Sequence, residues 1–222
     1  NYICETVKKE LALTDARFLS IPNPNLYSIS PRLRHKKTPL VFGYLGRLED
    51  DKGVRALVES FLDVSRQIDI KLRLAGDGSL KGVIAETAAR ESAVEYSGYI
   101  DSTDVGTWLN DIDVLIMPSL WAENFPGTAV QALMSGAPLI TFHIGGIPEI
   151  VKHNYNGLVA KVGDFAALNA FIKGFHDGDY PLDVFSANAV TSSDDYRYEN
   201  LSRMFLKAMS NFVADVEISA AK

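Results

Sequence analysis

Two cations lie five residues apart in a loop that follows the predicted strand Leu40–Leu45. Arg47 can grip a polyanion through its planar guanidinium, and Lys52 can add a compact positive charge. The alternative is that both are solvated loop charges that pair with the carboxylates between them, Glu49–Asp51. Surface ion pairs of that kind are common and contribute little. The spacing is compatible with either interpretation.

A second loop runs from Glu123 to Thr128 and leads into a predicted helix. Pro126 suits a first helical turn, so free amides near Gly127 and Thr128 can face an anion. The Glu123 carboxylate could accept hydrogen bonds from sugar hydroxyls. Its alternative role is a carboxylate that only benefits from the helix dipole.

A third loop, Thr141–Glu149, contains the adjacent glycines Gly145 and Gly146 before a short predicted helix. Glycines allow the backbone to approach a ligand closely. The same residues also describe an ordinary turn from strand to helix, with Glu149 in the first helical turn. In an open parallel sheet, loops of this type lie at the carboxyl ends of the strands, where ligands bind.

Other patterns give weaker signals. Asp111 and Asp113 match a metal-binding D-x-D, but they lead into a strand, so we expect capping or edge solvation and no metal site. Gly76-Asp77-Gly78 lacks the rest of a dinucleotide or phosphate-loop fingerprint. The four histidines have no partner cysteines at zinc-ligand spacing.

The elements that must position these loops alternate between strand and helix. We predict six strands: Leu40–Leu45, Ile70–Leu74, Val94–Ser97, Val114–Met117, Leu139–Phe142 and Leu158–Val162. Helical spacing is seen in Val54–Leu62, Leu80–Arg90, Val105–Leu109, Pro126–Gly136, Ile147–Lys152 and Phe165–Phe175. This alternation predicts an α/β, Rossmann-like parallel sheet with helices on both faces.

The chain divides into three predicted parts. Residues 1–25 contain a helix, a short strand Phe18–Ile21 and the turn-rich linker Pro22–Asn25, and we interpret them as the end of a preceding domain. Residues 26–194 are expected to form one Rossmann-like domain, in which Ser30–Pro39 is an exposed loop. Residues 195–222 form a C-terminal amphipathic helix and tail.

Composition excludes several classes of protein. The chain has 222 residues, of which 47% are hydrophobic and 23% charged, as in ordinary globular domains. A net charge of -6 argues against a nucleic-acid surface. The single cysteine, Cys4, favours a reducing compartment, and we find no signal peptide or membrane-spanning run. We therefore expect a soluble, cytoplasmic protein; peripheral membrane contact would come from another part of it.

Taken in order, these loops resemble the C-terminal domain of family-4 glycosyltransferases of the GT-B fold. The resemblance covers most of the chain from about Phe18. The most specific stretch is E-N-F-P-G-T-A-V-Q-A-L-M-S-G-A-P-L-I-T-F-H-I-G-G-I-P-E. G-R-L with K-G, A-G-D-G, G-Y and P-S match shorter family motifs.

The resemblance implies that residues 26–194 are a nucleotide-sugar-binding domain. Its donor would be a nucleotide-diphosphate sugar, bound with no metal or other cofactor. The diphosphate would be held by Arg47, Lys52 and the amides near Gly127 and Thr128, with Glu123 at the sugar ring. With Arg47 and Lys52, Glu123 would form the catalytic set. The remaining donor contacts would be Phe125, the nucleobase beside Tyr99 and Ile100, and the ribose near Gln131. Transfer would retain the anomeric configuration.

Two departures from the family pattern affect this interpretation. The family usually has a second glutamate where this chain has Gln131, whose amide can still accept one hydroxyl bond and donate another. The N-terminal domain that supplies the acceptor pocket is missing, so we expect this chain alone to be inactive. The alternatives are a nucleotide-sugar epimerase of the same fold and a non-catalytic nucleotide-binding module.

Overall fold

A computed structural model describes residues 2–12 and 29–220 of the chain, with side chains to residue 211. Its centre is one six-stranded sheet in the order β3-β2-β1-β4-β5-β6, and every adjacent pair of strands is parallel. The strands are β1 (Leu40–Leu45), β2 (Ile70–Ala75), β3 (Val94–Tyr96), β4 (Val114–Met117), β5 (Leu139–Phe142) and β6 (Gly157–Ala160). The predicted fold class is confirmed.

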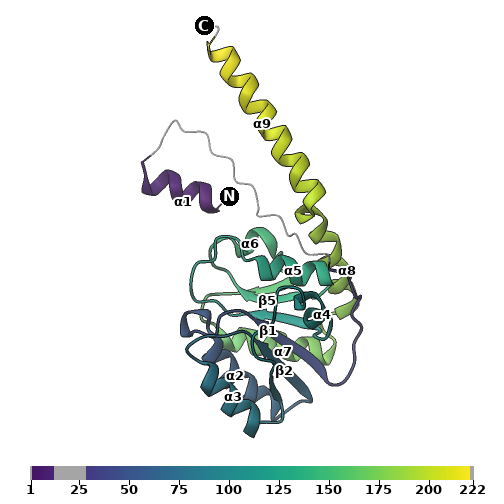
Figure 1. Cartoon of the computed structure of the whole chain (residues 1–222). Helices are drawn as coiled ribbons and strands as arrows, with labels where there is room; N and C mark the ends of the chain where they lie inside the picture. The colour runs from purple at the N-terminus through teal and green to yellow at the C-terminus, as the bar shows by residue number, and fades with distance from the viewer. Residues whose placement is uncertain (1, 13–28, 221–222) are drawn as a thin grey trace.

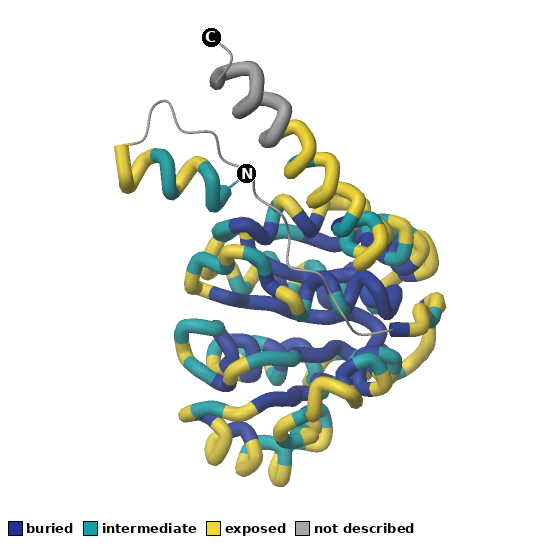
Figure 2. The backbone as a smooth tube through the Cα atoms, turned by 45° about the horizontal axis from the view of Figure 1, so that its top comes forward, coloured by how far each residue is buried: buried dark blue, intermediate teal, exposed yellow. Residues whose placement is uncertain are grey.

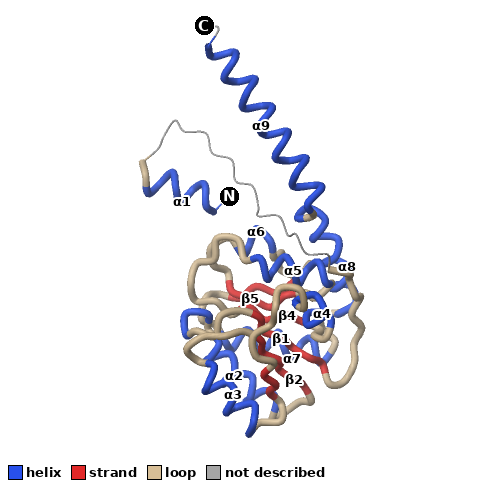
Figure 3. The backbone as a smooth tube through the Cα atoms, in the orientation of Figure 1, coloured by secondary structure: helices blue, strands red, loops and turns tan. Residues whose placement is uncertain are grey.

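The sheet is built from apolar runs because helices cover both of its faces (Figures 1 and 3). All four residues of β4 and of β5 are buried, as Figure 2 shows for the centre of the molecule. A strand buried on both faces must be apolar at every position, which explains the continuous runs seen in the sequence. The strand order reverses between β1 and β4, which is where such sheets bind ligands.

Two layers of helices enclose the sheet. One layer consists of α2 (Val54–Ser65), α3 (Lys81–Arg90) and α7 (Phe165–Asp177), whose apolar residues share a core with alternate residues of β1 and β2. The other consists of α4 (Val105–Asn110), α5 (Gly127–Ser135) and α6 (Ile147–Ile150), which pack in a second core with Leu115 and Leu139. Each layer buries one face of the strands and fixes the loops at their ends.

A helix that we did not predict, α8 (Leu182–Ser193), packs against α5. It buries Ser186 and Ser193 among its apolar residues, and serine weakens both the hydrophobic stripe and the local helix propensity. The Ser186 hydroxyl donates to the Gly136 carbonyl at 2.7 Å and accepts from the Arg34 amide. Long-range partners therefore stabilise this helix where the local sequence signal is weak.

The segment Ser30–Pro39 is mostly exposed as predicted, but Arg34 is fully buried, so the prediction was wrong at that residue. Its guanidinium donates to the carbonyls of Leu109 at 2.7 Å and of Ser135, at the ends of α4 and α5. Burial lowers the pKa of Arg34 to about 9. The cation satisfies carbonyl groups that helix ends leave without partners.

The prediction that Asp113 is a capping or solvated residue was also wrong, because it neither caps a helix nor lies in solvent. It is fully buried and accepts the Val41 amide of β1 at 2.8 Å. Its other oxygen lies 3.3 Å from Arg32 and 3.1 Å from Lys37. Asp111 is paired with Arg73 at 3.2 Å. Asp113 thus ties the start of β4 to β1 and to the N-terminal loop.

The two ends extend away from the sheet (Figure 1). Helix α1 (Tyr2–Glu10) has no buried residue, although its Tyr2 amide donates to Glu149. A short 3-10 helix η2 (Asp194–Tyr196) precedes the last helix, α9 (Tyr198–Ala220). The predicted strand Phe18–Ile21 lies outside the described residues. Within those residues, no helix is long and apolar enough to cross a membrane.

Candidate functional site

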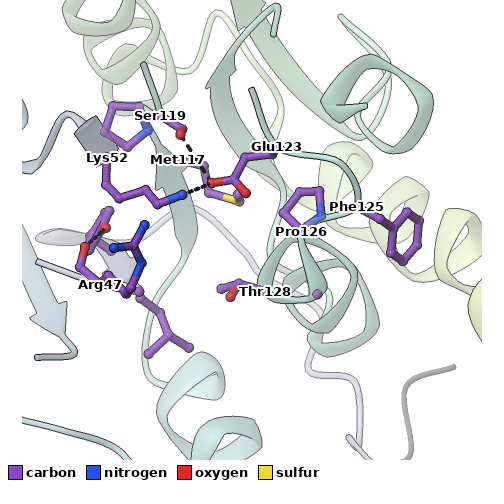
Figure 4. Close-up of a pocket in the computed structure, with 13 residues that line it drawn as sticks. Arg47, Lys52, Met117, Ser119, Glu123, Phe125, Pro126 and Thr128 are labelled. Atoms are coloured by element: carbon purple, nitrogen blue, oxygen red, sulfur yellow. Dashed lines mark hydrogen bonds and ion pairs between the residues drawn. The ribbon is translucent and has the colours of Figure 1, made fainter. Parts of the chain in front are cut away.

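A pocket of about 370 Å³ opens at the carboxyl ends of β1 and β4, at the reversal of strand order. Figure 4 shows its lining side chains. They come from the end of β1 and its following loop, from the β4–α5 loop, and from the first turn of α5: Tyr44, Leu45, Gly46, Arg47, Lys52, Met117, Pro118, Ser119, Glu123, Phe125, Pro126, Gly127 and Thr128. The structure therefore brings together the first two candidate loops.

Lys52 and Glu123, 71 residues apart, form an ion pair inside this pocket. The Lys52 ammonium lies 2.5 Å from Glu123 Oε1, and the side chains are only 14% and 22% exposed. Ser119, a buried residue, lies with its hydroxyl 3.2 Å from the same oxygen. Lys52 is therefore paired with Glu123 and not with Glu49–Asp51.

The carboxylates near Arg47 mostly have other partners. Glu49 accepts hydrogen bonds from the amide and hydroxyl of Ser79, which lower the pKa of its carboxyl. Asp50 is paired with Arg55 at 2.9 Å. Arg47 is paired with Asp51 at 3.6 Å, yet its side chain is 63% exposed. A contact this long and solvated is weak, so Arg47 can turn to an incoming anion.

Tyr44 is a pocket residue that the sequence did not single out. Its hydroxyl donates to the Arg47 carbonyl at 2.6 Å and fixes the backbone from which Arg47 projects. Burial raises the pKa of Tyr44, and the Glu123 carboxylate acts in the same direction, so the phenol remains neutral. In the sequence, the one feature that could have indicated Tyr44 as a pocket residue was its polar hydroxyl near the end of an apolar strand.

Helix α5 begins at the pocket with no side-chain cap. Pro126 occupies the N-cap position and has no polar side chain, so the first-turn amides of Gly127 and Thr128 have no intrahelical acceptor. Within the described part of the chain, a Cβ atom at Gly127 would meet nothing within 4 Å, which indicates open space in front of that turn. The helix N-terminus and the two cations therefore present positive potential to the same pocket.

The glycines of the third loop pack directly on the second loop. The Gly146 amide donates to the Glu123 carbonyl at 2.7 Å. A Cβ atom at Gly145 would lie 2.3 Å from that carbonyl oxygen, and one at Gly146 would lie 2.1 Å from the Asn124 oxygen. These glycines are needed for a close approach between backbones, and they hold the peptide of Glu123 in place.

The remaining predicted donor contacts are Phe125, Tyr99, Ile100 and Gln131. The Phe125 ring points away from Lys52 and Glu123 (Figure 4) and packs against Tyr196. Tyr99 is 70% exposed, and Ile100 is half-buried against the second core. Neither of them, nor Gln131, is among the described residues that line the pocket. Their roles in base and ribose binding stay predictions.

Comparison with known proteins places this geometry in a family. A family model described as glycosyl transferases group 1 matches residues 28–189. A 2-deoxystreptamine glucosyltransferase of Streptomyces kanamyceticus is 27% identical over 147 residues, which cover 64% of this chain and 38% of that enzyme. The matches span 30% to 39% of the curated relatives, well under half their length.

Solved structures of low sequence identity share the fold. Anabaena Alr3699/HepE in complex with UDP superposes with a TM-score of 0.70 at 21% identity, covering 78% of this chain and 49% of that one. The C-terminal domain of the group 1 family protein LpcC from Francisella tularensis superposes with a TM-score of 0.66 at 18% identity. The match covers 77% of this chain and 96% of that one. From the family match over most of its length, the chain belongs to the group 1 glycosyl transferases.

Proposed function

We propose that this chain is the donor-binding, C-terminal domain of a retaining family-4 glycosyltransferase. It would bind a nucleoside-diphosphate sugar whose sugar is transferred to an acceptor such as a glycan, a lipid or a small molecule. The convergence of Arg47, Lys52, Glu123 and the first turn of α5 on one pocket carries the proposal. The single cysteine supports placing the enzyme in the cytoplasm.

The chemistry follows from where charge develops. When the bond between the anomeric carbon and the diphosphate oxygen breaks, negative charge accumulates on the departing diphosphate. Arg47, Lys52 and the amides of Gly127 and Thr128 are hydrogen-bond donors at one pocket that would stabilise this charge without a metal ion. The acceptor hydroxyl would attack the same face and pass its proton to the diphosphate oxygen, so the configuration is retained.

Glu123 suits a sugar-binding role because only one of its oxygens has a partner among the described residues. Lys52 and Ser119 both approach Oε1. The other oxygen can accept a hydrogen bond from a sugar hydroxyl, and the backbone below is fixed by Gly146. Acceptor recognition would come from an N-terminal domain outside this chain, so the chain alone would not transfer sugar.

Calorimetric titration tests the proposal. UDP, GDP, ADP and TDP are compared with their nucleosides, with and without EDTA. At least one diphosphate should bind far more tightly than its nucleoside, and EDTA should not change it. No preference for any diphosphate would refute the donor site. Incubation of a longer protein with a nucleotide sugar alone separates transferase from epimerase, because an epimerase alters the sugar without an acceptor.

A further inference from the structure

Phe125 anchors the segment that connects Glu123 to α5. The preceding residue Asn124 is exposed, whereas the Phe125 ring is half-buried against the second core. The ring centroid lies 5.7 Å from that of Tyr196, with 56° between the ring planes. The pocket segment is thus held on its outer side by an aromatic contact.

Tyr196 contacts two segments beside the pocket. It belongs to η2, and its half-buried ring packs on Phe125 and the second core. Its hydroxyl donates to the Glu149 carbonyl of α6 at 3.4 Å. Burial raises the pKa of Tyr196, and Asp195 and Glu149 add to the shift, so the hydroxyl stays protonated. One side chain therefore bridges the β4–α5 loop and α6.

We propose that Tyr196 is a positioning residue for the diphosphate site, acting through Phe125 on the amides of Gly127 and Thr128. Gly127 lies only two residues after Phe125, so a shift of the ring displaces the first turn of α5. Hydrogen bonds to a diphosphate oxygen weaken steeply when their geometry is lost. This inference rests on the proposed function.

Two substitutions of Tyr196 test the inference, one that removes the aromatic ring and one that keeps it. In Tyr196→Ala the ring contact is lost, and UDP affinity should fall about three- to tenfold, as expected for an aromatic pair. Uridine affinity should change less than twofold. Tyr196→Phe keeps the ring and loses only a 3.4 Å hydrogen bond, so it should bind UDP within twofold of the parent chain.

Tyr180→Ala is the matched control. Tyr180 is also half-buried and packs against the rings of Phe175 and Phe185, in the core on the other face of the sheet. It should lower the thermal midpoint without changing UDP affinity. Equal losses of affinity in Tyr180→Ala and Tyr196→Ala would show a general loss of stability and overturn the inference.

Phe125→Leu provides a second variant if Tyr196→Ala does not fold. It should weaken UDP to a similar extent. Where Tyr196→Ala does fold, combining it with Phe125→Leu should add little, because both changes remove the same ring contact. If the parent chain binds UDP, GDP, ADP or TDP but neither ring variant weakens the bound diphosphate, Tyr196 has no positioning role. If the parent chain binds none of the four, the proposed function itself fails.

Discussion

Neutralising Glu123 should tighten the binding of a free nucleoside diphosphate. In the structure Lys52 is already paired with Glu123 at 2.5 Å, so an incoming diphosphate must compete with a carboxylate for this cation. The same carboxylate repels the diphosphate. Glu123→Gln keeps the shape of the side chain and removes the charge, which releases Lys52 and abolishes the repulsion.

The size of the effect follows from Coulomb's law. The Glu123 carboxylate and one negative charge of a diphosphate in the pocket are taken to be about 6 Å apart. At an effective dielectric of about 20, two unit charges at that distance interact by about 2.8 kcal/mol. Glu123 is 22% exposed, and water reduces that value. The amide still accepts a weaker hydrogen bond from Lys52. We therefore expect a net gain of about 0.7 to 1.4 kcal/mol, or about three- to tenfold in affinity for UDP.

Calorimetry with UDP and a UDP-sugar provides the assay. The sugar nucleotide should gain less than UDP, because the glutamine is a poorer acceptor for a sugar hydroxyl than the carboxylate. Glu95→Gln is the charge-matched control, since Glu95 lies on the edge strand β3 and pairs with Arg73. It should leave both affinities within twofold.

One result would refute this reasoning. If Glu123→Gln weakens UDP as strongly as Lys52→Ala does, Glu123 serves to hold Lys52 in place for the diphosphate and does not compete for it. The ion pair would then be preorganisation of the anion site, and the carboxylate would have no net repulsive effect.

Four further outcomes are expected. Arg47→Ala should weaken UDP by about 1.5 kcal/mol, the low end for bonds to charged groups, and leave uridine unchanged by calorimetry; equal losses would exclude a diphosphate contact. EDTA should not alter UDP affinity, and rescue by magnesium would contradict a metal-free site. Asp113→Ala should lower the free energy of unfolding by about 2 kcal/mol in urea titrations, because the Val41 amide of β1 loses its acceptor; a loss below about 1 kcal/mol would contradict the anchor role. Gln131→Glu should tighten UDP by at most about tenfold, and a gain that persists with a 2′,3′-dideoxy nucleotide would exclude ribose contact.

Local patterns in the sequence predicted most of the fold. The strands could be found because a parallel strand buried on both faces is apolar throughout, as β4 and β5 are. The edge of the sheet that carries the pocket could be predicted as well, because loops after parallel strands lie at one end of the sheet. Candidate residues such as Arg47 and Glu123 were recognisable from their position in those loops. Helix α8 was not predicted from the sequence because its buried serines interrupt the apolar stripe.

Only the tertiary structure decided which charged groups meet. Lys52 has three carboxylates close by in sequence, yet its partner is Glu123, 71 residues away. Arg34 and Asp113 look like surface charges but are buried, because helix-end carbonyls and a strand amide satisfy them. Phe125 lines the pocket as well as packing its ring on Tyr196, a contact between segments far apart in the sequence. Charge pairing depends on three-dimensional proximity and desolvation, and neither is encoded in local hydrophobic periodicity.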